Sequence, residues 1–223
     1  MSATSTAVAG APRVDVVHAA EHGDGARVRV ELFSDAVFAV AITLLMLDLP
    51  VHAASGSLLE ALADRWAAFA GFGISFAIIG CVWVSHFRLM RLVRHPDGAL
   101  LFINLGLLMS VVLVPFGTST MATFVMQPAA QSHLAAALFA AILVFMSVMF
   151  AVLHSLVAKR AGIVLPPART LAQRFDRARP MLGGIVNAAG IAVAFISPPS
   201  VLCMTGGVAI FYVLDSQRND RPC

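Results

Sequence analysis

Ser34 and Asp35 are the residues with the clearest potential for chemistry, because they lie at the start of an apolar segment within residues 29–50. The apolar core that follows them, residues 36–47, measures about 18 Å as a helix, whereas a bilayer core is about 30 Å thick. Both polar side chains are therefore expected within the membrane thickness. An ionisable group at that depth is costly unless it is paired or hydrated, so Asp35 marks a candidate functional site. The alternative is that Asp35 lies at the interface and caps the helix as an N-terminal anion.

A carboxylate in the membrane needs partners on a neighbouring helix, and three polar residues are candidates. Trp83 and His86 lie one turn apart near the end of the second apolar segment, and Asn104 lies near the start of the third. An indole can only donate, while an imidazole is neutral or charged, so either residue could satisfy a carboxylate. The alternatives are an interfacial aromatic for Trp83 and a polar residue flanking a loop for His86.

One face of the same segment has a different character. At 100° per residue, Val40, Thr43, Leu44 and Leu47 fall on one stripe, and Asp35 lies about 140° from Val40. This stripe is apolar apart from a single hydroxyl, and the acid points elsewhere. The Thr43 hydroxyl either faces a partner outside the helix or bonds back to a carbonyl of its own helix.

Helices in a membrane must position these residues, because the composition excludes a soluble domain. The chain has 223 residues, of which 59% are hydrophobic and only 12% charged, with a mean hydropathy of +0.87. Soluble domains usually carry about a quarter charged residues. The sequence predicts an all-α integral membrane protein with six transmembrane helices, at residues 32–50, 66–88, 98–126, 134–157, 180–198 and 199–215. Pro115 and Gly117 are expected to kink the third.

The basic residues indicate the orientation. With the amino terminus inside, fourteen of the fifteen Lys and Arg residues fall on the inner side and only Arg65 falls outside. The positive-inside rule then favours an even number of spans with both termini cytoplasmic. The expected organisation is a disordered cytosolic leader at residues 1–26, a transmembrane domain at 27–215 and a cytosolic tail at 216–223.

Enzyme, metal and nucleic-acid functions are not indicated. Neither H-E-x-x-H nor G-x-S-x-G occurs in the sequence, and His133 and His154 lack a partner at metal-ligand spacing. Cys81, Cys203 and Cys223 form no C-x-x-C pair, so no zinc site or disulfide framework is expected. No cofactor is expected either. The sequence pI of about 9.1 comes from loop residues between apolar segments, which is the membrane pattern and not a nucleic-acid surface.

A known family shares several of these features. Arg29, Phe33, Ser34 and Asp35 form an R-x-x-x-F-S-D pattern, which is followed by A-I-T-L-L at residues 41–45. This resembles the first helix of bacterial homologues of the endolysosomal potassium channel, transmembrane protein 175. The other matching features are Ser75, Phe76, Trp83, His86, Asn104, the Pro115–Phe116 pair and the A-F-I-S-P hinge at residues 194–198. The resemblance extends from about residue 27 to about residue 214.

The resemblance implies a passive potassium-permeable cation channel. Family members with one six-helix repeat assemble as homotetramers around a pore lined by the first helix, and the pore narrows at hydrophobic rings. Those rings fall here on Val40, Leu44 and Leu47, with Thr43 supplying a ring of hydroxyls. An isoleucine is common at the position of Val40, so the narrowest ring would be slightly wider. Asp48 is either a ring of carboxylates at the outer mouth or an exposed loop acid.

The polar residues of the first helix and their possible partners are also expected to form a network that anchors the pore helix. Its expected members are Arg29, Phe33, Ser34, Asp35, Trp83, His86 and Asn104. The expected partners are further copies of the chain, membrane lipid and potassium ions, in the inner membrane of a bacterial cell. The alternative is a proton-coupled secondary transporter that uses Asp35 and His86, although the sequence shows no internal repeat of the kind transporters usually have.

Overall fold

A computed structural model describes residues 13–49, 57–93, 95–160 and 184–219, and the side chains of 13–24, 48 and 212–219 lie outside this description. Every regular element within these ranges is a helix. The elements are α1 (Arg13–Leu44), the 3₁₀ helix η1 (Leu45–Asp48), α2 (Leu58–Ala63), α3 (Trp66–Met90), α4 (Gly98–Phe124), α5 (Ala129–Arg160), a short helix Gly184–Ala194 and α7 (Pro198–Asn219).

Four of these helices are long and apolar enough to cross a membrane. They are the Gly25–Leu47 part of the first helical segment, α3, α4 and α5. Gly184–Ala194 and Pro198–Phe211 are shorter apolar helices at the places where the fifth and sixth spans are expected. The chain is thus an all-helical membrane protein with four long and two shorter apolar helices.

The turn between the last two helices lies slightly earlier than expected. The backbone N–H groups of Ile196 and Ser197 both donate to the carbonyl of Val193, at 2.9 Å each. Pro198 is then the first residue of α7. Proline is well suited to that position, because the first N–H of a helix has no partner within the helix.

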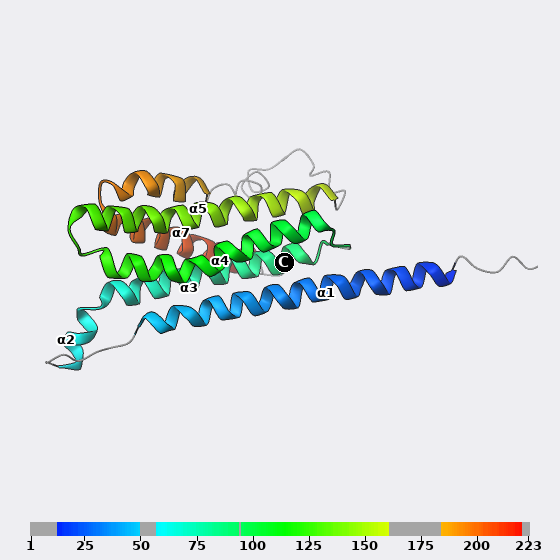
Figure 1. Cartoon of the computed structure of the whole chain (residues 1–223), viewed down its shortest axis with the longest axis horizontal. Helices are drawn as coiled ribbons and strands as arrows, with labels where there is room; N and C mark the ends of the chain where they lie inside the picture. Colours follow the sequence, from blue (N-terminus) through cyan, green and yellow to red (C-terminus); the bar gives the residue numbers. More distant parts are fainter. Residues whose placement is uncertain (1–12, 50–56, 94, 161–183, 220–223) are drawn as a thin grey trace, which may run out of the picture.

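The amino-terminal segment differs from the expectation of a disordered leader through residue 26. Helix α1 already begins at Arg13 and extends past the ends of its neighbours (Figure 1). Residues 13–32 include Ala, Glu and Arg, which favour helix, and extending an existing helix costs less than nucleating one. Residues 1–12 lie outside the described residues.

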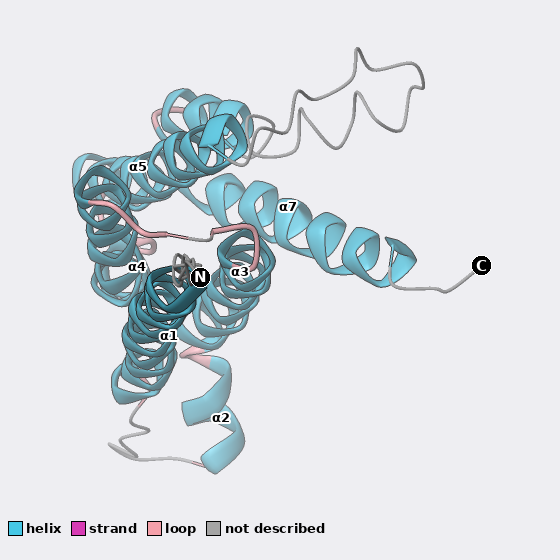
Figure 2. Cartoon of the chain, turned by 90° about the vertical axis from the view of Figure 1, so that its right-hand side faces the viewer, coloured by secondary structure: helices cyan, strands magenta, loops and turns pink. Residues whose placement is uncertain are grey.

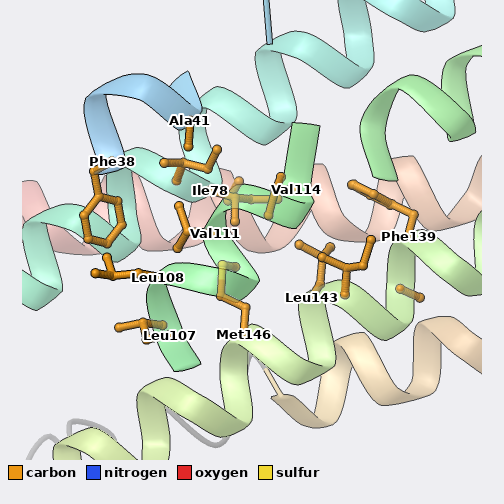
Figure 3. Close-up of a cluster of buried hydrophobic side chains, with 14 of the residues drawn as sticks. Phe38, Ala41, Ile78, Leu107, Leu108, Val111, Val114, Phe139, Leu143 and Met146 are labelled. Atoms are coloured by element: carbon orange, nitrogen blue, oxygen red, sulfur yellow. The ribbon is translucent and has the colours of Figure 1, made fainter. Parts of the chain in front are cut away.

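The long helices pack around a common apolar core. Helix α4 packs along α5 on one side and meets α1 and α3 on the other, while α7 packs mainly on α3 (Figure 2). Phe38 of α1, Val111 of α4 and Phe139 of α5 are among the fully buried side chains of this core (Figure 3). At Gly117, a Cβ atom would lie 2.8 Å from Ile142 Cδ1, so glycine is what allows α4 to approach α5 this closely.

Large apolar side chains remain exposed on every long helix of the single chain. Examples are Phe76 on α3, Phe102 on α4 and Val148 on α5. So much exposed apolar surface is not tolerated in water, and it fits a surface that contacts lipid or another copy of the chain.

Candidate functional site

Helix α1 has one buried face and one exposed face. Ser34, Phe38 and Ala41 follow the helical repeat, continued by Leu45 of η1, and all four are buried. The opposite face carries the exposed residues Phe33, Ala36, Val40 and Thr43, and Leu47 of η1 continues it. A helix that buries one stripe and exposes another is held in a defined rotation about its own axis.

A buried polar chain fixes the inner face of α1 to two other helices. The amide nitrogen Nδ2 of Asn104 donates to the Ser34 hydroxyl at 3.0 Å, and the amide oxygen Oδ1 lies 2.8 Å from His86 Nε2. Because the amide oxygen can only accept, His86 must carry its proton on Nε2 to complete this chain. All three side chains are buried, with 2% or less of their surface exposed.

Asp35 has a different partner, one residue further along α1. The indole Nε1 of Trp83 donates to Asp35 Oδ1 at 2.8 Å, which joins α1 to α3. His86 instead packs its ring against Phe38, with the ring centroids 5.5 Å apart. Of the three partners considered for the carboxylate, Trp83 is therefore the one that hydrogen-bonds to it, while Asn104 bonds to Ser34 and His86 bonds to Asn104.

Arg29 and Phe33 are the two expected network members that the structure does not place in this core. Both side chains are exposed on α1, whereas Ser34 next to them is fully buried. Ser34 and Asp35 each make a hydrogen bond from α1 to a neighbouring helix.

The predicted stripe lies on the exposed face of α1. Val40 is 54% exposed and Leu47 is 70% exposed, Thr43 is exposed, and Leu44 is half-buried. The Thr43 hydroxyl donates to the carbonyl of Val40 at 2.8 Å, so its proton is used inside the helix. Its oxygen lone pairs remain available to an outside group. Asp48 ends η1, but its side chain lies outside the described residues.

A second buried polar contact, between α3 and α4, includes a residue that the sequence did not single out. The hydroxyl oxygens of Ser75 and Thr118 lie 2.7 Å apart. Thr118 donates to the carbonyl of Val114, so Ser75 is the donor between the two helices. The only signal in the sequence is the position of Thr118, three residues after Pro115, which lies inside α4 and leaves a backbone carbonyl without its usual partner.

His133 has a role that its lack of metal-ligand spacing does not reveal. Its Nδ1 lies 2.6 Å from the carbonyl of Ala194, the last residue of the short helix, and its ring stacks on Phe195. It therefore ties the start of α5 to the turn before α7. Among the described residues, no three His, Cys, Asp or Glu side chains form a group that could hold a metal ion.

At the opposite end of the bundle, Asp97 joins the start of α4 to the end of α5. Its carboxylate accepts the backbone N–H of Leu100 at 3.0 Å and also pairs with the guanidinium of Arg160. The Leu100 N–H, and after it the Arg160 side chain, lower the pKa of Asp97 below its ordinary value.

The fold is that of a multi-pass helical membrane protein. Buried contacts with other helices hold one face of α1, and the opposite face is exposed. Residues 29–115 match the family described as the endosomal/lysosomal potassium channel TMEM175. A potassium channel of Streptomyces collinus is 38% identical over 186 residues, which cover 82% of this chain and 90% of that protein. A potassium channel of Chamaesiphon minutus is 38% identical over 153 residues, 67% of this chain and 71% of that one.

A solved structure shares the fold over most of the chain. The crystal structure of a lysosomal potassium-selective channel TMEM175 homolog from Chamaesiphon minutus superposes with a TM-score of 0.75 at 30% identity. The superposition covers 86% of this chain and 98% of that one. The chain belongs to the TMEM175 family, which is a family of channels and not of enzymes.

Proposed function

We propose that the chain is one subunit of a potassium-permeable channel whose pore is lined by α1. The observation that carries the proposal is the exposed stripe of residues 33–47, which is apolar except for Thr43 and lies opposite a face fixed by buried contacts. Val40, Thr43, Leu44 and Leu47 would look onto an axis shared by several copies. The relatives from Streptomyces collinus and Chamaesiphon minutus, both named potassium channels, support potassium as the permeant ion.

In this proposal the pore closes by apolar rings. Val40, Leu44 and Leu47 succeed one another along the helix. In an assembly of several subunits, the copies of each residue would form one ring around the pore. An apolar constriction excludes water and ions when it is narrow and conducts when it widens. The Thr43 oxygens would replace part of the hydration shell of an ion between these rings, because their lone pairs are not used by the bond to Val40.

The buried contacts of α1 would position the pore side chains. Successive residues lie 100° apart around a helix. If α1 rotated about its axis by that angle, another set of side chains would face the pore. Such a rotation would break the Ser34–Asn104 and Asp35–Trp83 hydrogen bonds. Leaving a buried polar group unsatisfied costs about 1–3 kcal/mol, so these bonds resist rotation.

The proposed assembly is a homotetramer in the inner membrane of a bacterial cell. Each subunit would cross the membrane six times, with the last two crossings built on the helices Gly184–Ala194 and Pro198–Asn219 and both termini in the cytoplasm. The concentration of Lys and Arg on one side supports this orientation. Asp48 would then lie at the outer mouth, where a ring of carboxylates would attract cations.

Planar-bilayer recording of the purified protein under potassium and sodium gradients tests the proposal. We expect unitary currents whose reversal potential follows the potassium gradient. A proton-coupled transporter that uses Asp35 and His86 would instead give no unitary currents and a flux that needs a pH gradient. Either of those results would reject the channel mechanism.

Replacing Leu44 with Asn tests the position of the constriction. A polar side chain in a closed apolar ring would let water remain in it, so the leak through vesicles containing the protein should rise. An unchanged flux would remove Leu44 from the constriction.

A further inference from the structure

Three side chains stack along the exposed face of α3 at the basic end of the bundle. Trp83, Phe87 and Arg91 follow one another at intervals of four residues. The rings of Trp83 and Phe87 are stacked, with their centroids 6.4 Å apart and their planes at 29°. The guanidinium carbon of Arg91 lies 5.8 Å from the centroid of the Phe87 ring. The two aromatic side chains are 40% and 48% exposed, so the stack lies on the surface of the chain.

The stack reaches from the end of the helix to the contact with α1. Eight residues of helix separate Arg91 from Trp83, a rise of about 12 Å. At the end of the stack away from Arg91, Trp83 donates to the carboxylate of Asp35. A group bound along this stack would therefore touch a side chain that is hydrogen-bonded to α1.

Arg91 lies where the apolar helix α3 ends, which is where a lipid headgroup is expected. Helix α3 ends at Met90 and Arg91 is its C-cap residue, so the guanidinium sits where the apolar segment stops. A guanidinium that stacks on a ring keeps the N–H groups at its edge free, and those groups match the oxygens of a phosphate in pairs. The exposed rings of Phe87 and Trp83 continue from there toward the membrane centre, where they offer apolar surface to an acyl chain.

The charge around the stack favours an anionic ligand. Lys159 is also exposed at this end of the bundle, beside the Asp97–Arg160 pair. Glu31 pairs with Arg27, and Asp35, at the far end of the stack, accepts the hydrogen bond of Trp83. A basic end of this kind attracts acidic lipids more strongly than zwitterionic ones.

We propose that Trp83, Phe87 and Arg91 form a binding site for an anionic phospholipid. The phosphate binds the guanidinium of Arg91, and one acyl chain lies along Phe87 and Trp83. Because Trp83 also holds Asp35, an occupied site stabilises the position of α1. The effect on conduction rests on the proposed channel function, whereas binding of the lipid does not.

Tryptophan fluorescence tests the site without measuring any flux. The chain has two tryptophans, so a Trp66→Phe background leaves Trp83 as the reporter. The protein is reconstituted in mixed phosphatidylglycerol and phosphatidylcholine vesicles, in which one or the other lipid carries brominated acyl chains that quench a neighbouring indole. We expect a preference for phosphatidylglycerol at Trp83 of about fivefold, the equivalent of ~1 kcal/mol for one arginine near an anionic headgroup.

Matched variants separate the site from the general charge of the surface. Arg91→Gln should abolish the preference, while Lys159→Gln, which removes the same charge from another exposed position at this end, should leave it largely intact. Raising the salt concentration should weaken the preference in the protein that retains Arg91, because salt screens exposed charges.

Three results would overturn the proposal. Equal quenching by both brominated lipids would show that the stack contacts the bilayer without preferring the anionic lipid. Quenching by neither would mean that another protein surface covers Trp83. A preference that survives Arg91→Gln would remove the arginine from the site. Since the readout is fluorescence, a protein that failed to conduct would still give a result on the lipid.

Discussion

Asn104 on α4 donates a hydrogen bond to the hydroxyl of Ser34 on α1, 3.0 Å away, although 70 positions separate the two residues in the chain. The same amide accepts from His86 on α3. One side chain therefore satisfies polar groups on two other helices, inside a core that is otherwise apolar. Such a connection ties the stability of the bundle to the position of the first helix.

Replacing Asn104 with Leu should destabilise the fold strongly. The substitution keeps a similar volume but leaves the Ser34 hydroxyl and the His86 Nε2–H buried without this partner. We expect the free energy of unfolding to fall by about 2–4 kcal/mol, because each unsatisfied buried group costs about 1–3 kcal/mol. Reversible unfolding in detergent micelles measures this loss.

Asn187 provides the matched control for that experiment. Its Nδ2 lies 3.4 Å from the Ser147 hydroxyl, at the long limit of a hydrogen bond. Asn187→Leu should therefore cost less than about 1 kcal/mol. Equal losses for the two variants would contradict a special role for Asn104.

Replacing Leu47 with Asn should increase the leak of ions through reconstituted vesicles severalfold. Leu47, in η1, is 70% exposed, and a polar amide there would keep water in an apolar ring. Val112→Asn on α4 is the control, since it places the same amide on another exposed surface. If both variants leaked alike, the effect would come from disturbed packing and not from a pore.

Replacing Thr43 with Val should change conduction while leaving stability nearly unaltered. The two side chains have almost the same shape, and the hydrogen bond lost is an exposed one within a single helix, worth about 1 kcal/mol or less. We expect a lower unitary conductance and an altered potassium-to-sodium ratio, with Thr43→Ser close to the unsubstituted protein. Bilayer recordings that gave the same currents for Thr43→Val would exclude the hydroxyl from the ion path.

The sequence predicts the helical part of this architecture because membranes impose simple rules. Long apolar segments must be helical to satisfy their backbone, and the order of the six apolar helices agrees with the structure. The polar residues within those segments also stand out, because each needs a partner. Trp83, His86 and Asn104 are therefore recognisable as partners of the first helix.

The sequence does not determine which of those polar residues pair with one another. Whether His86 reaches Asp35 or instead contacts Asn104 depends on how far each helix is rotated and shifted against the next. Close packing between the helices sets this arrangement, and it leaves no periodic pattern in the sequence. Thr118 was missed for the same reason, because its partner Ser75 lies on another helix.

The pair formed by Asp97 and Arg160 should contribute to stability in a pH-dependent way. The pKa of Asp97 is lowered in the folded protein from its ordinary value of 3.8. A lowered pKa means that the stabilisation is fully present above the unfolded value and is lost as the pH falls through the folded value. The difference in melting temperature between the protein and Asp97→Asn should thus be constant above about pH 5 and shrink below about pH 4.

Arg160→Gln is the companion variant in that titration. It should reduce the pH-dependent difference without removing it, because the first cause of the lowered pKa, the Leu100 N–H, remains in place. A difference that stayed constant down to about pH 3 would show that the Asp97 carboxylate contributes nothing to the fold in its charged form.

Replacing Gly117 with Ala should destabilise the contact between α4 and α5. The added Cβ would lie 2.8 Å from Ile142 Cδ1 and 3.2 Å from Phe139 Cδ2, so both side chains would have to move inside a filled core. Overpacking of this kind costs about 1–3 kcal/mol, which unfolding in micelles would detect. Gly80→Ala on α3 is the control, because a Cβ there meets nothing within 4 Å and alanine favours helix over glycine by about 0.5–1 kcal/mol. The opposite signs expected for the two alanines make the pair decisive: if Gly117→Ala were as stable as Gly80→Ala, the close approach of α4 to α5 would not depend on glycine.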